Sequence, residues 1–314
     1  QKASAPIQAR ASGLFVVDPI PANTGNTREF SEIDLEEYAD NKAQGDQASR
    51  ARVQQGYNKI MIKKRVAKNI GITFEMRTEN KYQDVTRRLT NLGNLVPNRM
   101  ELDLQHRFGF ATATSMTDKN GDTVDLTLGD TLQLAHTAHT VRGSSATYRN
   151  RLANNPVVSR GSLEGMENLV VEQTPNQFGE KMTMPFDVIW STDDPNTTNT
   201  IREYLKSTAS PDAAHAGVEN VYAGKYRHVV LSRVATTAAG AVDSTKAKYW
   251  GLASTLMSTA HLGIWEESHL LSPAPGNNGE DIQTDDWEYG TRGGYGICIV
   301  SAAWFKISTG DGVA

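Results

Sequence analysis

Apolar and polar residues alternate along one stretch in the first third of the chain. Ile70, Ile72, Phe74 and Met76 alternate there with Gly71, Thr73, Glu75 and Arg77. A period of two residues is typical of a strand with one buried face, because successive side chains of a strand point to opposite sides. The pattern predicts a strand over residues 70–77.

A period of three to four residues distinguishes the stretch Tyr82–Phe110. Its apolar positions form two stripes, Tyr82, Val85, Leu89 and Leu92 followed by Met100, Leu104 and Phe108. Such stripes are typical of a helix with one buried face. Gly93 and Pro97 separate them, and a proline suits the first turn of a helix better than its interior. The pattern predicts either two helices or one helix kinked near 93–97.

Shorter patterns predict the remaining elements. Asn120-Gly121 between alternating residues predicts a hairpin within Ser115–Leu128. Asp194 followed by Pro195 predicts the start of a helix, and a short amphipathic helix is predicted over 160–174. Strands are predicted at Phe186–Trp190, Tyr226–Val234, Lys248–Ala253, Leu262–Glu266 and Trp287–Ile307. Helices and strands alternate too irregularly for a doubly wound parallel sheet, so the predicted fold class is α+β.

Three further segments are predicted to be irregular. Gln1–Asn26 is either an extended arm anchored by a short strand at Leu14–Val17 or a flexible tail. Ser272–Gly279 is predicted to be a loop because it is rich in proline, glycine and asparagine. The glycine-rich Gly290–Gly294 is predicted to be a turn between two strands.

Charge is segregated between the N-terminal segment and the predicted strand at 70–77. Glu29–Asp40 carries six carboxylates and no base, whereas Arg50–Lys68 carries seven bases and no carboxylate. The two halves could pair as a long hairpin with Gly45 near its tip, could offer opposite charges to neighbouring copies, or could form a solvated, partly disordered run. Because a strand follows at once, we interpret the segment as an excursion from a folded domain.

Composition narrows the class of protein. The 314 residues, of which 38% are hydrophobic and 22% charged, indicate a globular protein of one or two domains. The net charge of −4 argues against tight nucleic-acid binding by the whole surface. No stretch approaches the roughly 18 continuous apolar residues of a spanning helix, so no membrane partner is expected. The single cysteine, Cys298, excludes an internal disulfide and lies in an apolar run, where a thiol is usually a core residue.

No group of residues in the sequence indicates catalysis or a cofactor. Asp118–Asp125 is similar to a calcium loop, but Thr123 and Gly129 stand where that loop needs a glycine and a carboxylate, which favours a hairpin turn. His136 and His139 could share a metal only with a third ligand, and we interpret them as surface histidines. The sequence also contains no phosphate loop, dinucleotide fingerprint or nucleophile elbow. We therefore expect no enzyme activity, no cofactor and no metal.

As a whole, the chain resembles the major capsid proteins of tailed bacteriophages, which have the Hong Kong 97-type fold, and in particular the branch with Mu-type heads. The serial order carries this resemblance: an N-terminal arm, then a charged excursion, then the long helical stretch Tyr82–Phe110. Several short stretches also resemble this branch, namely 125–139, 146–150, 160–174 leading to 185–190, 219–222, 248–252 and 285–296. The resemblance covers nearly the whole chain.

The resemblance implies a division of the chain into five parts. Residues 1–27 would form the N-arm, 28–76 the extended E-loop hairpin, 77–140 the peripheral (P) domain with its spine helix and hairpin, 141–284 the axial (A) domain, and 285–314 the closing P-domain strands. The charged residues of the E-loop are then the candidate intersubunit contacts: Glu32, Glu36, Glu37, Asp40, Arg50, Arg52, Lys59, Lys63 and Lys64.

The resemblance also implies a structural function. The chain would self-assemble into hexamers and pentamers of an icosahedral shell that encloses double-stranded DNA without reading its sequence. Its location would be the virion capsid, assembled in the cytoplasm of the bacterial host. Portal, scaffold, protease and decoration proteins are expected partners, and Gln1 fits a chain trimmed by a maturation protease.

Two alternatives to this function remain open. An encapsulin-like shell with the same fold would hold protein cargo in place of DNA. A soluble metal-dependent enzyme would use His136 and His139. Nuclease-resistant nucleic acid in purified particles tests the first alternative, and the metal content of the chain tests the second.

Overall fold

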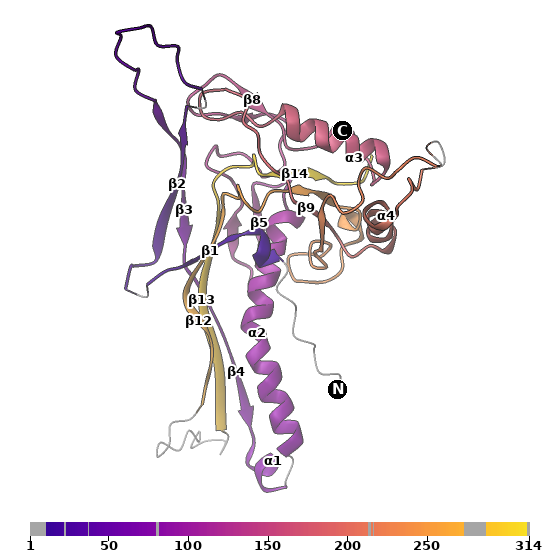
Figure 1. Cartoon of the computed structure of the whole chain (residues 1–314). Coiled ribbons are helices and arrows are strands. Elements are labelled where there is room, and N and C mark those ends of the chain that lie inside the picture. The colour runs from indigo at the N-terminus through magenta and orange to yellow at the C-terminus, as the bar shows by residue number, and fades with distance from the viewer. Residues whose placement is uncertain are drawn as a thin grey trace.

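The computed structural model describes residues 11–21, 23–36, 38–79, 82–212, 215, 217–272 and 287–312. A long helix and long strands form its narrow lower part, shorter helices lie in the wider upper part, and a hairpin projects at the upper left (Figure 1). Helices and strands follow one another irregularly, which confirms the predicted α+β class. Within these ranges, no helix is both long and apolar enough to cross a membrane.

A four-stranded sheet forms the narrow part, with the order β1-β12-β13-β4. Its strands are β1 (Val16–Pro19), β12 (Ala260–Leu271), β13 (Trp287–Ile299) and β4 (Lys64–Ile72). β13 pairs antiparallel with β12 and with β4, and β1 pairs parallel with β12. β1 follows a short 3-10 helix, Ala11–Leu14, so the predicted anchoring strand is confirmed slightly later than expected.

The strand predicted over residues 70–77 is wrong in its second half. β4 ends at Ile72, and Phe74–Thr78 forms the short helix α1. Thr73 caps this helix, because its side-chain oxygen accepts a hydrogen bond from the backbone N–H of Met76. A threonine N-cap followed by Glu75 in the first turn favours a helix start. Alternation of apolar residues concealed that signal.

The turn predicted at Gly290–Gly294 is also wrong, because β13 runs through these glycines without interruption. A Cβ on Gly293 would lie 2.8 Å from Cγ1 of Val96, and one on Gly296 would lie 2.7 Å from Cγ of Met61. Glycine inside a strand often marks the close approach of another element. Here it lets the long helix and the projecting hairpin pack closely against the sheet.

The long helix α2 (Tyr82–Gly109) is continuous over 28 residues, so the two-helix alternative is wrong. Pro97 lies inside it, where proline cannot donate a hydrogen bond to the carbonyl of Gly93. Leu92, Leu104 and Phe108 are buried, and α2 contacts β4, β12 and β13. We infer that this packing outweighs the lost backbone hydrogen bond.

A second four-stranded sheet forms the wider part, with the order β10-β9-β11-β14. Its strands are β9 (Val188–Ser191), β10 (Arg227–Val230), β11 (Trp250–Ala253) and β14 (Phe305–Ser308). Helix α3 (Arg160–Glu172) contacts β14, and helix α4 (Pro195–Lys206) contacts β10. The predicted cap at Asp194 is confirmed, since its carboxylate accepts a hydrogen bond from the N–H of Thr197.

The remaining elements are small. They are the antiparallel pairs β5 (Ser115–Thr117) with β6 (Thr123–Asp125) and β7 (His139–Thr140) with β8 (Thr147–Tyr148), and the 3-10 helix Ser244–Lys246. The first pair confirms the hairpin predicted from Asn120-Gly121, and Gly121 adopts the positive φ of 94° that this turn needs. The loop predicted at Ser272–Gly279 lies, after its first residue, outside the described ranges.

Aromatic rings fill the centre of the wider part. The ring of Phe108, near the end of α2, stacks on Phe305 of β14 with centroids 4.9 Å apart and on Trp190 of β9 at 5.8 Å. Trp190, Trp304 and Phe305 are fully buried. Offset aromatic pairs add a contribution beyond burial alone. This cluster fixes α2 against the second sheet.

Lys306, on β14, is fully buried within the same region. Its Nζ donates to the carbonyl oxygens of Gln173 at 2.8 Å and Arg149 at 3.4 Å, and lies 5.6 Å from the centroid of the Tyr148 ring. Burial lowers the pKa of Lys306 to about 7. Folding therefore releases a proton from this group between about pH 7 and the ordinary lysine pKa.

We expect the substitution Lys306→Met to flatten the pH dependence of stability above pH 7. Because the folded pKa of Lys306 lies below its unfolded value, the wild-type free energy of unfolding should rise with pH through this window, by about 1.4 kcal/mol per pH unit from this group. Urea unfolding of unassembled subunits between about pH 7.5 and 9.5 measures the slope. Parallel profiles for the two proteins would contradict the assigned lowered pKa.

Candidate functional site

The projecting hairpin consists of β2 (Thr27–Leu35) and β3 (Val53–Ile62), which pair antiparallel with Leu35 opposite Val53. This confirms that the charged segment is a structured excursion. Gly45 lies in the connection between the strands and has a φ of 89°. The second side is shorter than predicted: it ends at Ile62, and the chain then enters β4 of the first sheet.

The inner face of the hairpin is attached to the body of the same chain. The ring of Phe30 stacks on His261 of β12, with centroids 4.2 Å apart. Glu32 accepts a hydrogen bond from the side-chain amide of Gln177 at 2.9 Å, and Asp34 accepts one from the backbone N–H of Gln177 at 2.9 Å. Two of the acidic residues therefore position the hairpin on its own subunit.

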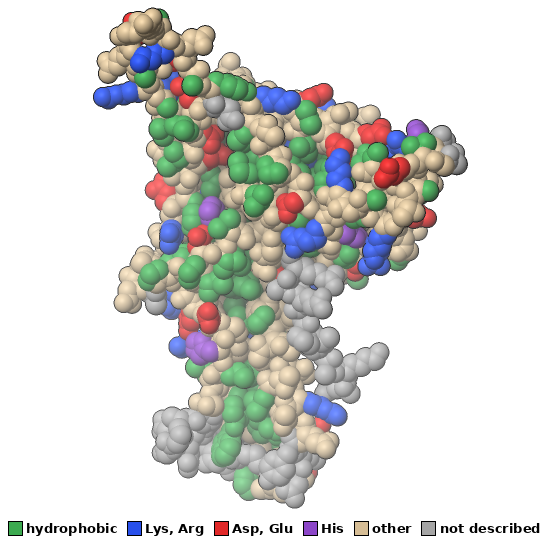
Figure 2. All heavy atoms as spheres, in the orientation of Figure 1, with side chains coloured by type: hydrophobic (Ala, Val, Ile, Leu, Met, Phe, Trp, Pro, Cys, Tyr) green, Lys and Arg blue, Asp and Glu red, His purple; other side chains and the backbone are tan. Residues whose placement is uncertain are grey.

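The outer face of the hairpin is apolar and exposed to solvent. Ile33, Leu35 and Val53 lie on this face and are 65%, 57% and 67% exposed. Hydrophobic side chains are visible on the surface where the hairpin runs (Figure 2). Sequence reasoning concentrated on the charges and missed this apolar group. The signal was present as the alternation of Ile33 and Leu35 with Glu32, Asp34 and Glu36.

One ion pair joins the two sides of the hairpin where its strands end. Arg52 Nη2 lies 2.5 Å from Glu36 Oε1, and the backbone N–H of Arg52 donates to Glu36 Oε2 at 3.3 Å. Hydrogen bonds from Arg52 lower the pKa of Glu36 below its usual value. The Arg52 guanidinium also lies 5.2 Å from the centroid of the Phe178 ring. The predicted pairing of the acidic and basic halves therefore occurs here within one chain.

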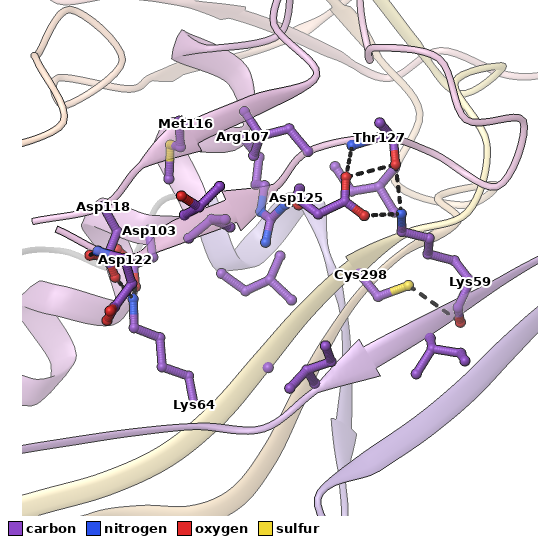
Figure 3. A pocket seen from close by; sticks show the side chains of 18 of the residues that line it. Lys59, Lys64, Asp103, Arg107, Met116, Asp118, Asp122, Asp125, Thr127 and Cys298 are labelled. Atoms are coloured by element: carbon purple, nitrogen blue, oxygen red, sulfur yellow. Dashed lines mark hydrogen bonds and ion pairs between the residues drawn. The ribbon is translucent and has the colours of Figure 1, made fainter. Parts of the chain in front are cut away.

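A cavity of about 320 Å³ lies at the base of the hairpin, between β3, α2, β13 and the β5–β6 hairpin. Lys59 of β3 crosses to Asp125, with 2.6 Å between Nζ and Oδ2, and donates to Thr127 Oγ1 at 2.8 Å (Figure 3). Ile60 and Ile62 line the cavity and remain more than half exposed, so it is open to solvent on that side.

A buried network of charges forms another wall of this cavity (Figure 3). Asp118, with 1% of its side chain exposed, pairs with Lys64 of β4 and, at 2.9 Å, with Nη2 of Arg99 on α2. Asp103 pairs with the same two bases at 3.1 and 2.9 Å. Burial would raise the pKa of Asp118, but hydrogen bonds from Lys64 and from the N–H groups of Asn120 and Asp122 lower it to about 2.

The predicted contact residues differ in whether they already have partners within the chain. Glu32, Lys59 and Lys64 make contacts within the chain, and Lys63 lines the cavity. Asp40 and Arg50 are exposed near the tip, whereas Glu37 lies outside the described residues. Their role between subunits stays a prediction. The contacts of Lys59 and Lys64 give these two lysines a stabilising role that the charge pattern alone did not indicate.

His139 and Cys298 are both buried, which corrects one prediction and confirms the other. The surface assignment of His139 is wrong: it is fully buried, and its two ring nitrogens contact Asp130 at 2.7 Å and the carbonyl of Leu134 at 3.3 Å. Cys298 is buried, as predicted, and burial raises its pKa to about 12. Among the described residues, no three His, Cys, Asp or Glu side chains gather as a metal-binding group.

The architecture, with a long helix along one sheet, a second sheet and a projecting hairpin, is shared with solved structures of phage capsids. The chain matches a chain of the capsid of cyanophage P-SCSP1u with a TM-score of 0.55 and 10% identity, over 97% of this chain and 88% of that one. It matches a chain of the mature capsid of bacteriophage PhiM1 with a TM-score of 0.53 and 9% identity, over 98% and 88%. A chain from Gordonia phage Cozz matches with a TM-score of 0.51 and 14% identity, over 98% and 88%.

These matches confirm that the chain has the fold of phage capsid proteins, as its resemblance in serial order predicted. No protein-family model matches the sequence, and no curated protein matches it. The boundaries of the N-arm, E-loop, P-domain and A-domain stay predictions.

Proposed function

We propose that the chain is a phage major capsid protein that self-assembles into hexamers and pentamers of an icosahedral shell around double-stranded DNA. The observation that carries this is the capsid fold, matched over nearly the whole chain, including to a mature capsid. The role is structural and not enzymatic. The shell would be part of the virion and would assemble in the bacterial cytoplasm, with portal, scaffold, protease and decoration proteins as further partners.

The hairpin supports this proposal as an intersubunit arm. Its inner face is fixed to its own chain through Gln177, whereas its outer face presents Ile33, Leu35 and Val53 to solvent. Exposed apolar side chains that lie together on a projecting element are typical of an interaction surface. In a shell they would be covered by a neighbouring subunit, with Asp40 and Arg50 at the polar rim.

We also propose two changes to the predicted domain boundaries. β12 (Ala260–Leu271) falls within the predicted A-domain but pairs with β13 in the first sheet, so it belongs with the P-domain. β14 (Phe305–Ser308) falls within the predicted closing P-domain strands but pairs with β11 in the second sheet, so it belongs with the A-domain. The E-loop proper is then the hairpin that ends at Ile62.

Electron microscopy of the full chain after expression in bacteria tests the proposed function. We expect closed shells of uniform size, because ring-forming contacts between identical copies close into symmetric assemblies. Purified shells from infected cells should protect double-stranded DNA from nuclease. Subunits that stay monomeric at high concentration, with and without co-expressed scaffold, would contradict the proposal. Shells that contain protein and exclude nucleic acid would contradict its DNA-enclosing part.

A further inference from the structure

A second, much smaller cavity lies where the inner face of the hairpin meets the body. Its volume is about 20 Å³, the space of a single water molecule or ion. Its walls come from four distant parts of the chain, and they include Glu32 of β2, Asp130 after β6, Gln177 after α3 and Ser301 after β13. Oxygen-bearing side chains of both the hairpin and the body therefore line the same small cavity.

One side-chain oxygen at this cavity is buried without a hydrogen-bond partner. Gln177 and Ser301 are only 6% and 8% exposed, and both line the cavity. Gln177 Oε1 has no partner among the described residues, whereas the hydroxyl of Ser301 interacts with the Glu32 carboxyl group. A buried polar atom left unpaired is destabilising, so Gln177 Oε1 calls for an explanation. A cation in the cavity would explain this unpaired oxygen, because it would accept one of the oxygen's lone pairs.

The charge around the cavity is negative. Glu32 and Asp130 both line it, and among the described residues no Lys or Arg forms an ion pair with either of them. Asp130 contacts His139, and the nearby Arg142 donates to the carbonyl of Gly56. Each carboxylate oxygen of Asp130 accepts one hydrogen bond and keeps a further lone pair. Burial and the neighbouring carboxylates of Asp34 and Asp130 raise the pKa of Glu32 to about 7, and a positive occupant would stabilise its ionised form.

We propose that this cavity binds a calcium ion, held by the carboxylates of Glu32 and Asp130, the amide oxygen of Gln177 and the hydroxyl of Ser301. Hard divalent cations take oxygen ligands of these types, and calcium tolerates irregular sets completed by water. Two of the four ligands are carboxylates and two are neutral oxygen donors, a combination that suits a hard cation.

The cavity lies between the hairpin and the body, so a bound ion would connect the two. Glu32 belongs to the hairpin, whereas Asp130, Gln177 and Ser301 belong to the body. A bound ion would join the two and hold the hairpin at its observed angle. This inference goes beyond the proposed function and does not depend on it, since binding can be measured on unassembled subunits.

Isothermal titration of the full chain with calcium chloride, after treatment with a chelator, tests the proposal. We expect one calcium ion per chain in the wild type. Glu32→Gln should weaken the affinity by about tenfold or more, because it removes a charged ligand. The matched control is Glu29→Gln on the outer face of the same strand, where Glu29 only accepts a hydrogen bond from Asn58. Its affinity should equal that of the wild type.

A second variant keeps the test decisive if Glu32→Gln fails to fold. Ser301→Ala removes one hydroxyl and keeps the backbone hydrogen bonds of Ser301 to Thr259, so folding should tolerate it, while the calcium affinity should fall severalfold. Absence of binding up to calcium concentrations on the order of 10 mM would overturn the proposal and leave water in the cavity. Binding that neither Glu32→Gln nor Ser301→Ala weakens would place the ion elsewhere and overturn it equally.

Discussion

Replacing Ile33, Leu35 and Val53 together by aspartate is expected to abolish shell assembly and leave a folded, soluble subunit. The three side chains are more than half exposed in the single chain, so their loss should change its free energy of unfolding by only about 0.5 kcal/mol each. In a shell they would lie against a neighbour, where unpaired carboxylates carry a desolvation cost of several kcal/mol. The assembled fraction should fall by more than about 100-fold, which corresponds to roughly 3 kcal/mol per contact.

Sedimentation and negative-stain electron microscopy measure that fraction, and circular dichroism verifies that the variant is folded. The matched control is Ile33→Val with Leu35→Ile and Val53→Ile, which keeps the same three positions apolar and should assemble normally. A folded aspartate variant that forms shells with wild-type yield would refute the role of the outer face. In that event the exposed charges Asp40 and Arg50 would be the next candidates for the contact.

The elements that the sequence predicted correctly are those decided by neighbouring residues. Asp194-Pro195 starts α4, and Asn120-Gly121 turns the β5–β6 hairpin, because capping and turn formation need only a few adjacent groups. The strand predicted over 70–77 failed because two local signals competed there, whereas the turn predicted at Gly290–Gly294 failed because distant packing decides. Gly293 lies inside β13 because α2 passes close to it, and nothing near Gly293 in the sequence reports that approach.

The candidate site follows the same division. The charge pattern offered a hairpin with two oppositely charged sides as one of three alternatives, since those residues are close in sequence, and the structure has this hairpin. It could not indicate which charges pair, because Lys59 meets Asp125 and Lys64 meets Asp118 across more than fifty residues. The cavity that joins Glu32 to Ser301 spans most of the chain. Only the folded backbone brings such residues together.

Asp118 provides the largest expected effect on the stability of the subunit. Its carboxylate joins three elements: its own β5–β6 hairpin, β4 through Lys64, and α2 through Arg99. Asp118→Ala would leave two bases near a largely buried site with Asp103 as the remaining acid. Breaking a buried ion pair by removing one partner costs about 3–5 kcal/mol, and we expect a loss of that size in the free energy of unfolding.

Urea unfolding of unassembled subunits at neutral pH measures this loss, and Asp122→Ala is the matched control. Asp122 lies in the same turn but is exposed, so its replacement should cost no more than about 0.5 kcal/mol.

The pH dependence of the free energy of unfolding gives a second readout. Since the folded pKa of Asp118 is about 2, below its ordinary value of 3.8, the stability it provides is present above pH 4 and is lost as the pH falls toward 2. Asp118→Ala should remove that part of the acid response, and equal losses in the Asp118 and Asp122 variants would show that the network does not hold the three elements together.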